Sequence, residues 1–149
     1  MASSPNRSTV TIDGNKFDCV SVSVAFQTEK DRAGMPQMGS LSTSIKAYVD
    51  FHDDQNMPFS TLKKIFDLSN VVTRDKVRNI KIEFWKDDSK QDALVSYGFN
   101  GWVSSFHTLN PYQNDQATQA DHIGVNHMLV LELEPSLNQQ NFKDVTLSN

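Results

Sequence analysis

The sequence predicts a mainly β domain, namely a small β-barrel or two-sheet sandwich of antiparallel strands with one flanking α-helix. Three observations predict it: stretches of alternating apolar and polar residues, turn residues between them, and one segment with apolar residues at helical spacing. Strands with a single apolar face must bury it against another layer, so we expect the sheet to pack on itself. A chain of 149 residues suits one domain, and we treat 1–149 as a single unit.

The first strands follow a polar lead, which we expect to be flexible over residues 1–8. Residues 9–12 alternate and run into Asp13-Gly14, a strong signal for a two-residue hairpin. Residues 16–27 then read as one strand with an apolar face and a face of small residues. The two faces are Val20, Val22, Val24 and Phe26 against Ser21, Ser23 and Ala25.

Residues 28–40 interrupt the alternation with two glycines, a proline, two methionines and a dense mixture of charges. Loops of this length are commonly functional. A loop tip without a role is an equally good interpretation at this point.

The alternation resumes at residues 41–50, where Ser42 and Ser44 lie opposite the apolar side chains. Residues 58–68 form the one convincing helix, and Pro58 suits its first turn. Its apolar stripe predicts packing against the core. The stripe consists of Phe59, Leu62, Ile65 and Phe66.

Three further strands are expected at residues 77–85, 93–106 and 127–134. The second of these is either one long strand or a bent pair, since Asn100-Gly101 is typical of a hairpin turn or a bulge. A second polar loop precedes the last strand at residues 110–126. Residues 136–149 form a polar tail.

Composition excludes several classes of protein. Ser, Thr, Asn and Gln make up 46 of the 149 residues, which is unlike a coiled coil, and a single cysteine excludes a disulfide scaffold. The net charge of -4 and the lack of a basic cluster argue against nucleic-acid binding. Neither a membrane-spanning apolar run nor an apolar signal peptide occurs, so we expect a cytoplasmic chain that does not insert into membranes.

The search for catalytic or metal-binding residues finds no constellation. The four histidines lack the spacing of metal ligands, and Cys19 has no basic neighbour to activate it. Glu132 and Glu134 project from one strand face, which is better read as a solvated or interface face than as an acid–base pair. We therefore expect no enzyme activity, no cofactor and no metal. The histidines are His52, His107, His122 and His127.

One alternative is a sugar-binding β-sandwich. Trp85, Trp102 and Tyr112 could form a stacking platform for a sugar, although each could equally cap a core or an interface.

The order of these elements resembles the Hcp (TssD) family, the tube proteins of type VI secretion systems. The resemblance spans about residues 9–133 and is strongest at 17–36, where a strand is followed by a pattern of Gln, Asp, Gly and Pro. The matching residues are Gln27, Asp31, Gly34, Pro36 and Gly39. Asp31 lies one residue further from Gln27 than in the family pattern, and the loop at 110–126 is longer than its family counterpart.

The resemblance implies a homohexameric ring, with rings stacked into a hollow tube that carries effector proteins in its lumen. Its partners would be further copies of itself, the sheath and spike of the secretion apparatus, and the effectors. The chain would be cytoplasmic before firing and then secreted without a signal peptide. A tail-tube protein of a phage-like or extracellular injection particle is an alternative within the same class.

On this interpretation the loop at 28–40 stacks one ring on the next, since methionine offers adaptable apolar contacts and the mixed charges can set the register. The helix would contact the core or a neighbouring subunit. The small polar strand faces would suit a smooth lumen or a polar contact. The expected stacking residues are Lys30, Asp31, Arg32, Gly34, Met35, Pro36 and Met38.

Overall fold

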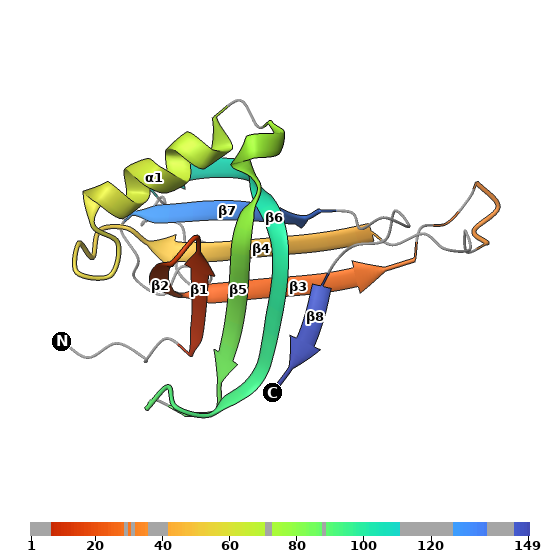
Figure 1. Cartoon of the computed structure of the whole chain (residues 1–149), viewed down its shortest axis with the longest axis horizontal. Helices are drawn as coiled ribbons and strands as arrows, with labels where there is room; N and C mark the ends of the chain where they lie inside the picture. The colour runs from red at the N-terminus through yellow and green to blue at the C-terminus, as the bar shows by residue number, and fades with distance from the viewer. Residues whose placement is uncertain are drawn as a thin grey trace.

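The computed structural model describes residues 7–28, 30, 32–35, 42–70, 73–87, 89–110, 127–136 and 145–149. Its strands form one antiparallel sheet with a single α-helix beside it, as predicted (Figure 1). The elements are β1 (Ser8–Ile12), β2 (Asn15–Cys19), β3 (Ser21–Gln27), β4 (Ser42–Asp50), α1 (Phe59–Ser69), a 3-10 turn (Arg74–Lys76), β5 (Arg78–Trp85), β6 (Ala93–Leu109), β7 (Met128–Pro135) and β8 (Val145–Ser148). Within these residues no helix is long and apolar enough to cross a membrane.

The sheet folds into two halves that share the long strand β6. The strand order is β2-β1-β5-β6-β7-β4-β3, and β8 pairs with the first part of β6. In Figure 1, β1, β5 and the first part of β6 stand upright, whereas β3, β4 and β7 lie across them. We call these the upright half-sheet (with β2 and β8) and the transverse half-sheet (with the second part of β6).

Gly101 is where β6 passes from one half-sheet to the other. It pairs with Arg78 of β5 and with Pro135 of β7. A side chain here would collide with the neighbouring strand, because a Cβ atom built on Gly101 would lie 2.2 Å from the carbonyl oxygen of Glu134. The predicted bend is confirmed, but Asn100-Gly101 lies within a continuous strand, and the bulge follows between Val103 and Ser105.

The hydrophobic core fills the space between the two half-sheets. Buried side chains come from both halves, from the turn after β4 and from α1, which lies across one end of the strands (Figure 1). The prediction of inward apolar faces is therefore confirmed for β4 and β7. The core consists of Val10, Ile12, Phe17, Cys19, Ile45, Ala47, Val49, Met57, Ile65, Ile80, Ile82, Phe99, Val103, Leu129, Leu131 and Leu133.

Two predictions at the N-terminal end need correction, and one is confirmed. The strand expected at 16–27 is split at Val20, because β2 pairs with β1 in the upright half-sheet and β3 pairs with β4 in the transverse one. The lead is shorter than expected, since Ser8 already belongs to β1 and is buried. The hairpin at Asp13-Gly14 is confirmed, and both residues have positive φ, as a type I′ turn requires.

Asp18 connects β2 to three other segments. Its carboxylate accepts a hydrogen bond from Thr9 Oγ1 at 2.8 Å and forms an ion pair with Lys90. Its backbone is paired by the side-chain amide of Asn56, which accepts from the Asp18 N–H and donates to the Asp18 carbonyl, both at 2.8 Å. Because β2 is an outer strand of the sheet, Asn56 takes the place of a neighbouring strand and covers this edge.

The polar tail contains a strand that its composition did not predict. β8 pairs with β6 from Ser96 to Phe99, and Val145 packs against the core. Leu147 remains 64% exposed.

Candidate functional site

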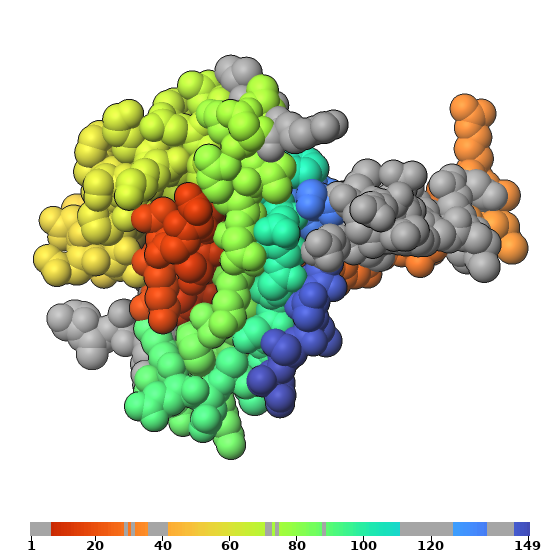
Figure 2. Space-filling model, in the orientation of Figure 1, coloured from red at the N-terminus to blue at the C-terminus, as the bar shows by residue number. Residues whose placement is uncertain are grey.

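The loop expected to stack rings connects β3 to β4 and projects from the body of the protein (Figure 2, orange). Lys30 and Arg32 are exposed in it, and Met35 is 62% exposed. Gly34 has a φ of 84°, a conformation that glycine adopts without strain. Asp31, Pro36, Met38 and Gly39 lie outside the described residues.

The outer face of the transverse half-sheet is polar, and four serines lie in its β3–β4 part. Residues paired across antiparallel strands point to the same side, so the register places Ser21, Ser23, Ser42 and Ser44 on one face. The polar faces expected for the two strands thus form one continuous surface, a relation that the register reveals. The face continues through Tyr48 and Lys46 onto Val130 and Glu132 of β7, and then onto His107 and Ser105 of β6.

The two glutamates of β7 lie among these polar residues rather than in a catalytic cleft. Glu132 is opposite Lys46 in the register, and Glu134 accepts a hydrogen bond from the hydroxyl of Thr43 at 3.3 Å. A cationic side chain and a hydroxyl beside the two carboxylates fit a surface role, as expected from the sequence.

The transverse half-sheet has two edges that no described strand covers. β3 pairs with β4 on one side only, and β6 from Trp102 to Leu109 pairs only with β7. β3 contains neither proline nor a charged residue, the features with which proteins usually protect such edges. Uncovered edges of this kind favour pairing with a strand of another chain.

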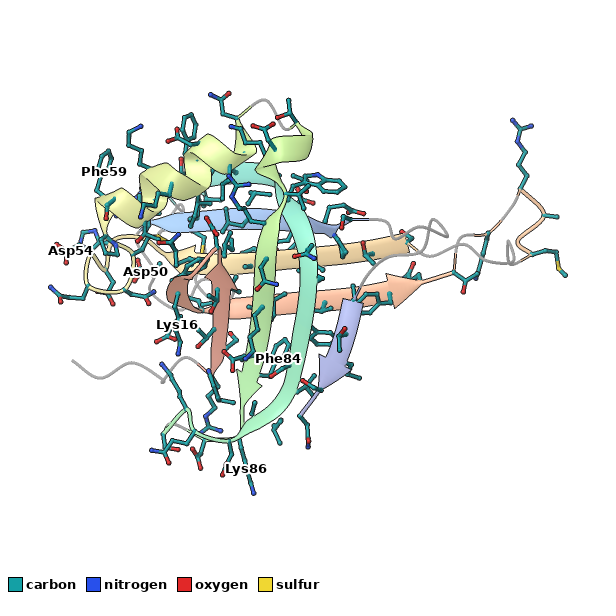
Figure 3. The ribbon with its side chains drawn as sticks, viewed as in Figure 1. Lys16, Asp50, Asp54, Phe59, Phe84 and Lys86 are labelled. Carbon is teal, nitrogen blue, oxygen red and sulfur yellow. The ribbon has the colours of Figure 1, made fainter. Side chains whose placement is uncertain are left out.

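The helix stripe is only partly buried. Ile65 is buried and Leu62 packs against the core, but Phe59 is 74% exposed and points away from the sheet (Figure 3). Phe66 is 47% exposed, with one edge against the ring of Phe106 at 5.4 Å between centroids. The prediction of core packing is thus wrong for Phe59 and only partly right for Phe66, because a helix lying across the end of a sheet buries a narrow face.

Cys19 is buried in the core. Burial raises the pKa of its thiol far above the ordinary value, and the neighbouring charge of Asp18 raises it further. The thiolate is the reactive form, so this environment suppresses nucleophilic chemistry.

We expect alkylation of Cys19 in the folded protein to be at least about a hundredfold slower than in urea, because the thiol is both protonated and shielded. Iodoacetamide labelling followed by mass spectrometry measures the rate. A Met35→Cys variant supplies an exposed thiol in the same chain and should react as fast folded as unfolded. Equal rates for Cys19 in both states would contradict its burial.

The structure brings together two of the four histidines. Nδ1 of His52 and Nδ1 of His127 are 2.9 Å apart, where β4 ends and β7 begins. His107 lies on the polar face, and His122 is outside the described residues. No group of three or more side chains from the metal-binding types converges in the part of the chain that the structure describes.

The proposed sugar platform is not assembled. Trp85 is only 8% exposed, and its indole N–H donates to Thr9 Oγ1 at 2.8 Å. Trp85 pairs with Ala93, whereas Trp102 lies nine residues further along β6, which is about 30 Å of strand. Tyr112 is outside the described residues. The two tryptophans therefore cannot stack on one sugar.

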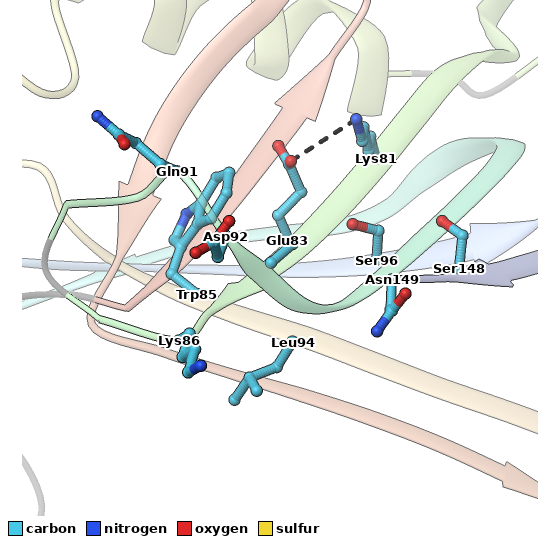
Figure 4. A pocket seen from close by; sticks show the side chains of 11 residues that line it. Lys81, Glu83, Trp85, Lys86, Gln91, Asp92, Leu94, Ser96, Ser148 and Asn149 are labelled. Carbon is cyan, nitrogen blue, oxygen red and sulfur yellow. Dashed lines mark ion pairs between the residues drawn. The ribbon is translucent and has the colours of Figure 1, made fainter.

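A shallow pocket of about 630 Å³ lies beside Trp85 at the outer surface of the upright half-sheet (Figure 4). Lys81 in it forms an ion pair with Glu83 at 3.6 Å. The hydroxyls of Ser96 and Ser148 and the carboxylate of Asp92 also line it.

The structure also reveals features that reasoning from the sequence missed. The uncovered edge of β6 depends on the pairing of distant strands, which no local pattern reveals. The absence of charge on β3 was visible, but its meaning required knowing that β3 is an outer strand.

Among the comparisons with known proteins, the one with solved structures finds matches, and these agree on the fold. No family model and no curated protein matches the sequence. Among solved structures, Hcp1 from Flavobacterium johnsoniae matches with a TM-score of 0.58 at 12% identity, covering 95% of this chain and 94% of that one. Hcp1 from the E. coli EAEC 042 pathovar gives 0.60 at 9% identity, covering 96% and 97%.

A third match is the PVC sheath/tube terminator of an extracellular contractile injection system in its extended state. Its TM-score is 0.57 at 14% identity, and it covers 100% of this chain and 98% of that one. The chain has the fold of Hcp tube proteins over nearly its whole length, which confirms the fold-level resemblance predicted from the order of the elements.

Proposed function

We propose that this protein is the structural subunit of the inner tube of a contractile injection apparatus. Six copies form a ring, and rings stack into a tube whose lumen carries effector proteins. The observation that carries this proposal is the transverse half-sheet, which combines a serine-rich face on β3 and β4 with two edges that no described strand pairs with. The likeness of the fold to Hcp proteins supports it.

The ring is formed when β3 of one copy pairs with the second part of β6 of the next copy. The contact is heterologous, since two different edges meet, and such contacts can close into rings. The serine-rich face of β3 and β4 then lines the lumen, with Lys46 and Glu132 beside the serines. This role needs no catalytic residue and no cofactor.

The loop between β3 and β4 stacks the rings. The loop projects from the body of the protein, and Met35 and Arg32 are exposed in it, so they can reach an adjacent ring. Phe59 and Phe66 on α1 are available for contacts with neighbouring subunits or the sheath. The spike and the effectors complete the set of proposed partners.

Either a type VI secretion system or an extracellular injection particle would use such a subunit, and the fold is similar to proteins of both. In a type VI system the chain would stay in the cytoplasm until firing and would then be secreted.

Deleting residues 34–38 is expected to leave folded rings that no longer stack, because the loop makes contacts between rings and not within them. Light scattering after gel filtration measures the ring mass, and electron microscopy counts stacked rings. An unchanged ring mass is the control for folding. Tubes of normal length from the shortened chain would contradict the stacking role.

A further inference from the structure

His52 and His127 form a direct imidazole pair that the tube role does not use. The two Nδ1 atoms are 2.9 Å apart, the ring planes differ by 10°, and the centroids are 4.9 Å apart. This geometry fits an N–H···N hydrogen bond between nearly parallel rings, with one Nδ1 protonated and the other bare.

The pair connects two segments that are distant in the sequence. His127 directly precedes β7, and its carbonyl accepts a hydrogen bond from the Phe51 N–H at 3.3 Å. His52 belongs to the turn between β4 and α1. Two further contacts hold that turn. The side chain of Asn56 is hydrogen-bonded to the backbone of β2, and the side chain of Met57 is buried. Neither of those two anchors can change its charge, so the imidazole pair is the anchor that responds to pH.

The charged groups around the pair are carboxylates of the same turn. Asp50 accepts from the backbone N–H of His52 at 3.0 Å, and Asp53 accepts from backbone N–H groups of its own turn. Asp54 is exposed at the same end of the protein (Figure 3). The titratable groups nearest in register on the strands are Tyr48 on β4, Glu132 on β7 and His107 on β6.

We propose that the His52–His127 pair is a proton-sensitive latch. It is closed while at least one imidazole is neutral, and it opens when both are protonated. With one proton added, a charged Nδ1–H donates to a bare Nδ1, which strengthens the bond. With two, both Nδ1 atoms are donors, no acceptor remains between them, and two positive charges face each other. Histidine is the side chain that changes charge between about pH 5 and 8.

The position of the latch ties it to stacking, and this part rests on the proposed function. β4 begins beside the stacking loop at Ser42 and ends at Asp50, so the loop and the latch lie at opposite ends of the transverse half-sheet. In a head-to-tail stack the loop of one ring meets the latch end of the next. We therefore infer that acidification loosens the surface on which the next ring docks.

Two measurements test the latch. In the wild-type protein, the amount of tube that sediments should fall by about tenfold or more between pH 8 and pH 5, as expected for the loss of a charged hydrogen bond. His52→Gln cannot acquire the second charge and should keep its tubes at the lower pH. Lys86→Gln changes an exposed charged residue in the turn after β5, far from the pair, and is the control that should behave as wild type. The same pH response in His52→Gln as in wild type would overturn the proposal.

Imidazole NMR spectra of the protein in solution provide a test that does not depend on tubes. Contacts between the rings of His52 and His127 should be present at about pH 8 and lost at about pH 5. Contacts that persist unchanged at the lower pH would overturn the latch. A protein that forms no tubes at either pH, yet loses these contacts on acidification, would instead refute the proposed function and leave the latch standing.

Discussion

Replacing Gly101 with alanine is expected to lower the free energy of unfolding by about 3 kcal/mol or more, or to prevent folding. The new Cβ would lie 2.2 Å from the carbonyl oxygen of Glu134 and 3.0 Å from its carbonyl carbon. Both are backbone atoms of β7, so they cannot rotate aside as the end of a side chain could. Relief requires β6 and β7 to separate where the two half-sheets meet. Urea unfolding followed by circular dichroism measures the loss.

Gly98→Ala is the matched control, three residues earlier on the same strand. A Cβ there would meet nothing within 4 Å, and we expect a change within about 0.5 kcal/mol. Equal losses for the two variants would show that β6 is generally intolerant of a side chain. In that case Gly101 would have no special part in the bend.

Proline substitutions at alternate positions of β3 are expected to abolish rings and leave the fold of the subunit intact. Successive N–H groups of a strand point to opposite edges. One of the two variants Ser23→Pro and Val24→Pro therefore removes a hydrogen bond to β4, and the other removes only the N–H that points away from the sheet. The second kind of variant should keep its thermal stability but lose rings by about tenfold or more, because a partner carbonyl is left unpaired at each interface. Gel filtration with light scattering measures the rings.

Ser44→Ala serves as the control, since it changes the same polar face one strand in from the edge. It should leave ring formation intact. A proline variant with unaltered stability and a full complement of rings would contradict pairing through β3.

Much of the fold could be predicted because it depends on short-range patterns. Alternation assigned the faces of β4 and β7, where Ile45, Ala47 and Leu131 are buried as expected. Asp13-Gly14 encodes its own turn through positive φ angles. The order of these elements was enough to predict the fold.

The remaining features depend on contacts between distant segments. The break at Val20 exists because β2 and β3 join different half-sheets, and no local residue marks it. The exposure of Phe59 depends on how α1 lies against the sheet. The meeting of His52 and His127, 75 positions apart, follows from the register of β4 with β7. Periodicity along the chain contains none of this information.

The candidate surfaces were predicted to a smaller degree. The serines of each strand were expected on its polar face, and the register adds that the two faces are continuous. The stacking role of Lys30, Arg32, Gly34 and Met35 remains a prediction. The interfaces themselves depend on which strands lie outermost, and this follows only from the complete strand order.

Electron microscopy of the purified protein in negative stain tests the central claim most directly. The account predicts uniform six-fold rings with a central hole, together with stacks of these rings. Particles that remain monodisperse monomers at high protein concentration would contradict it.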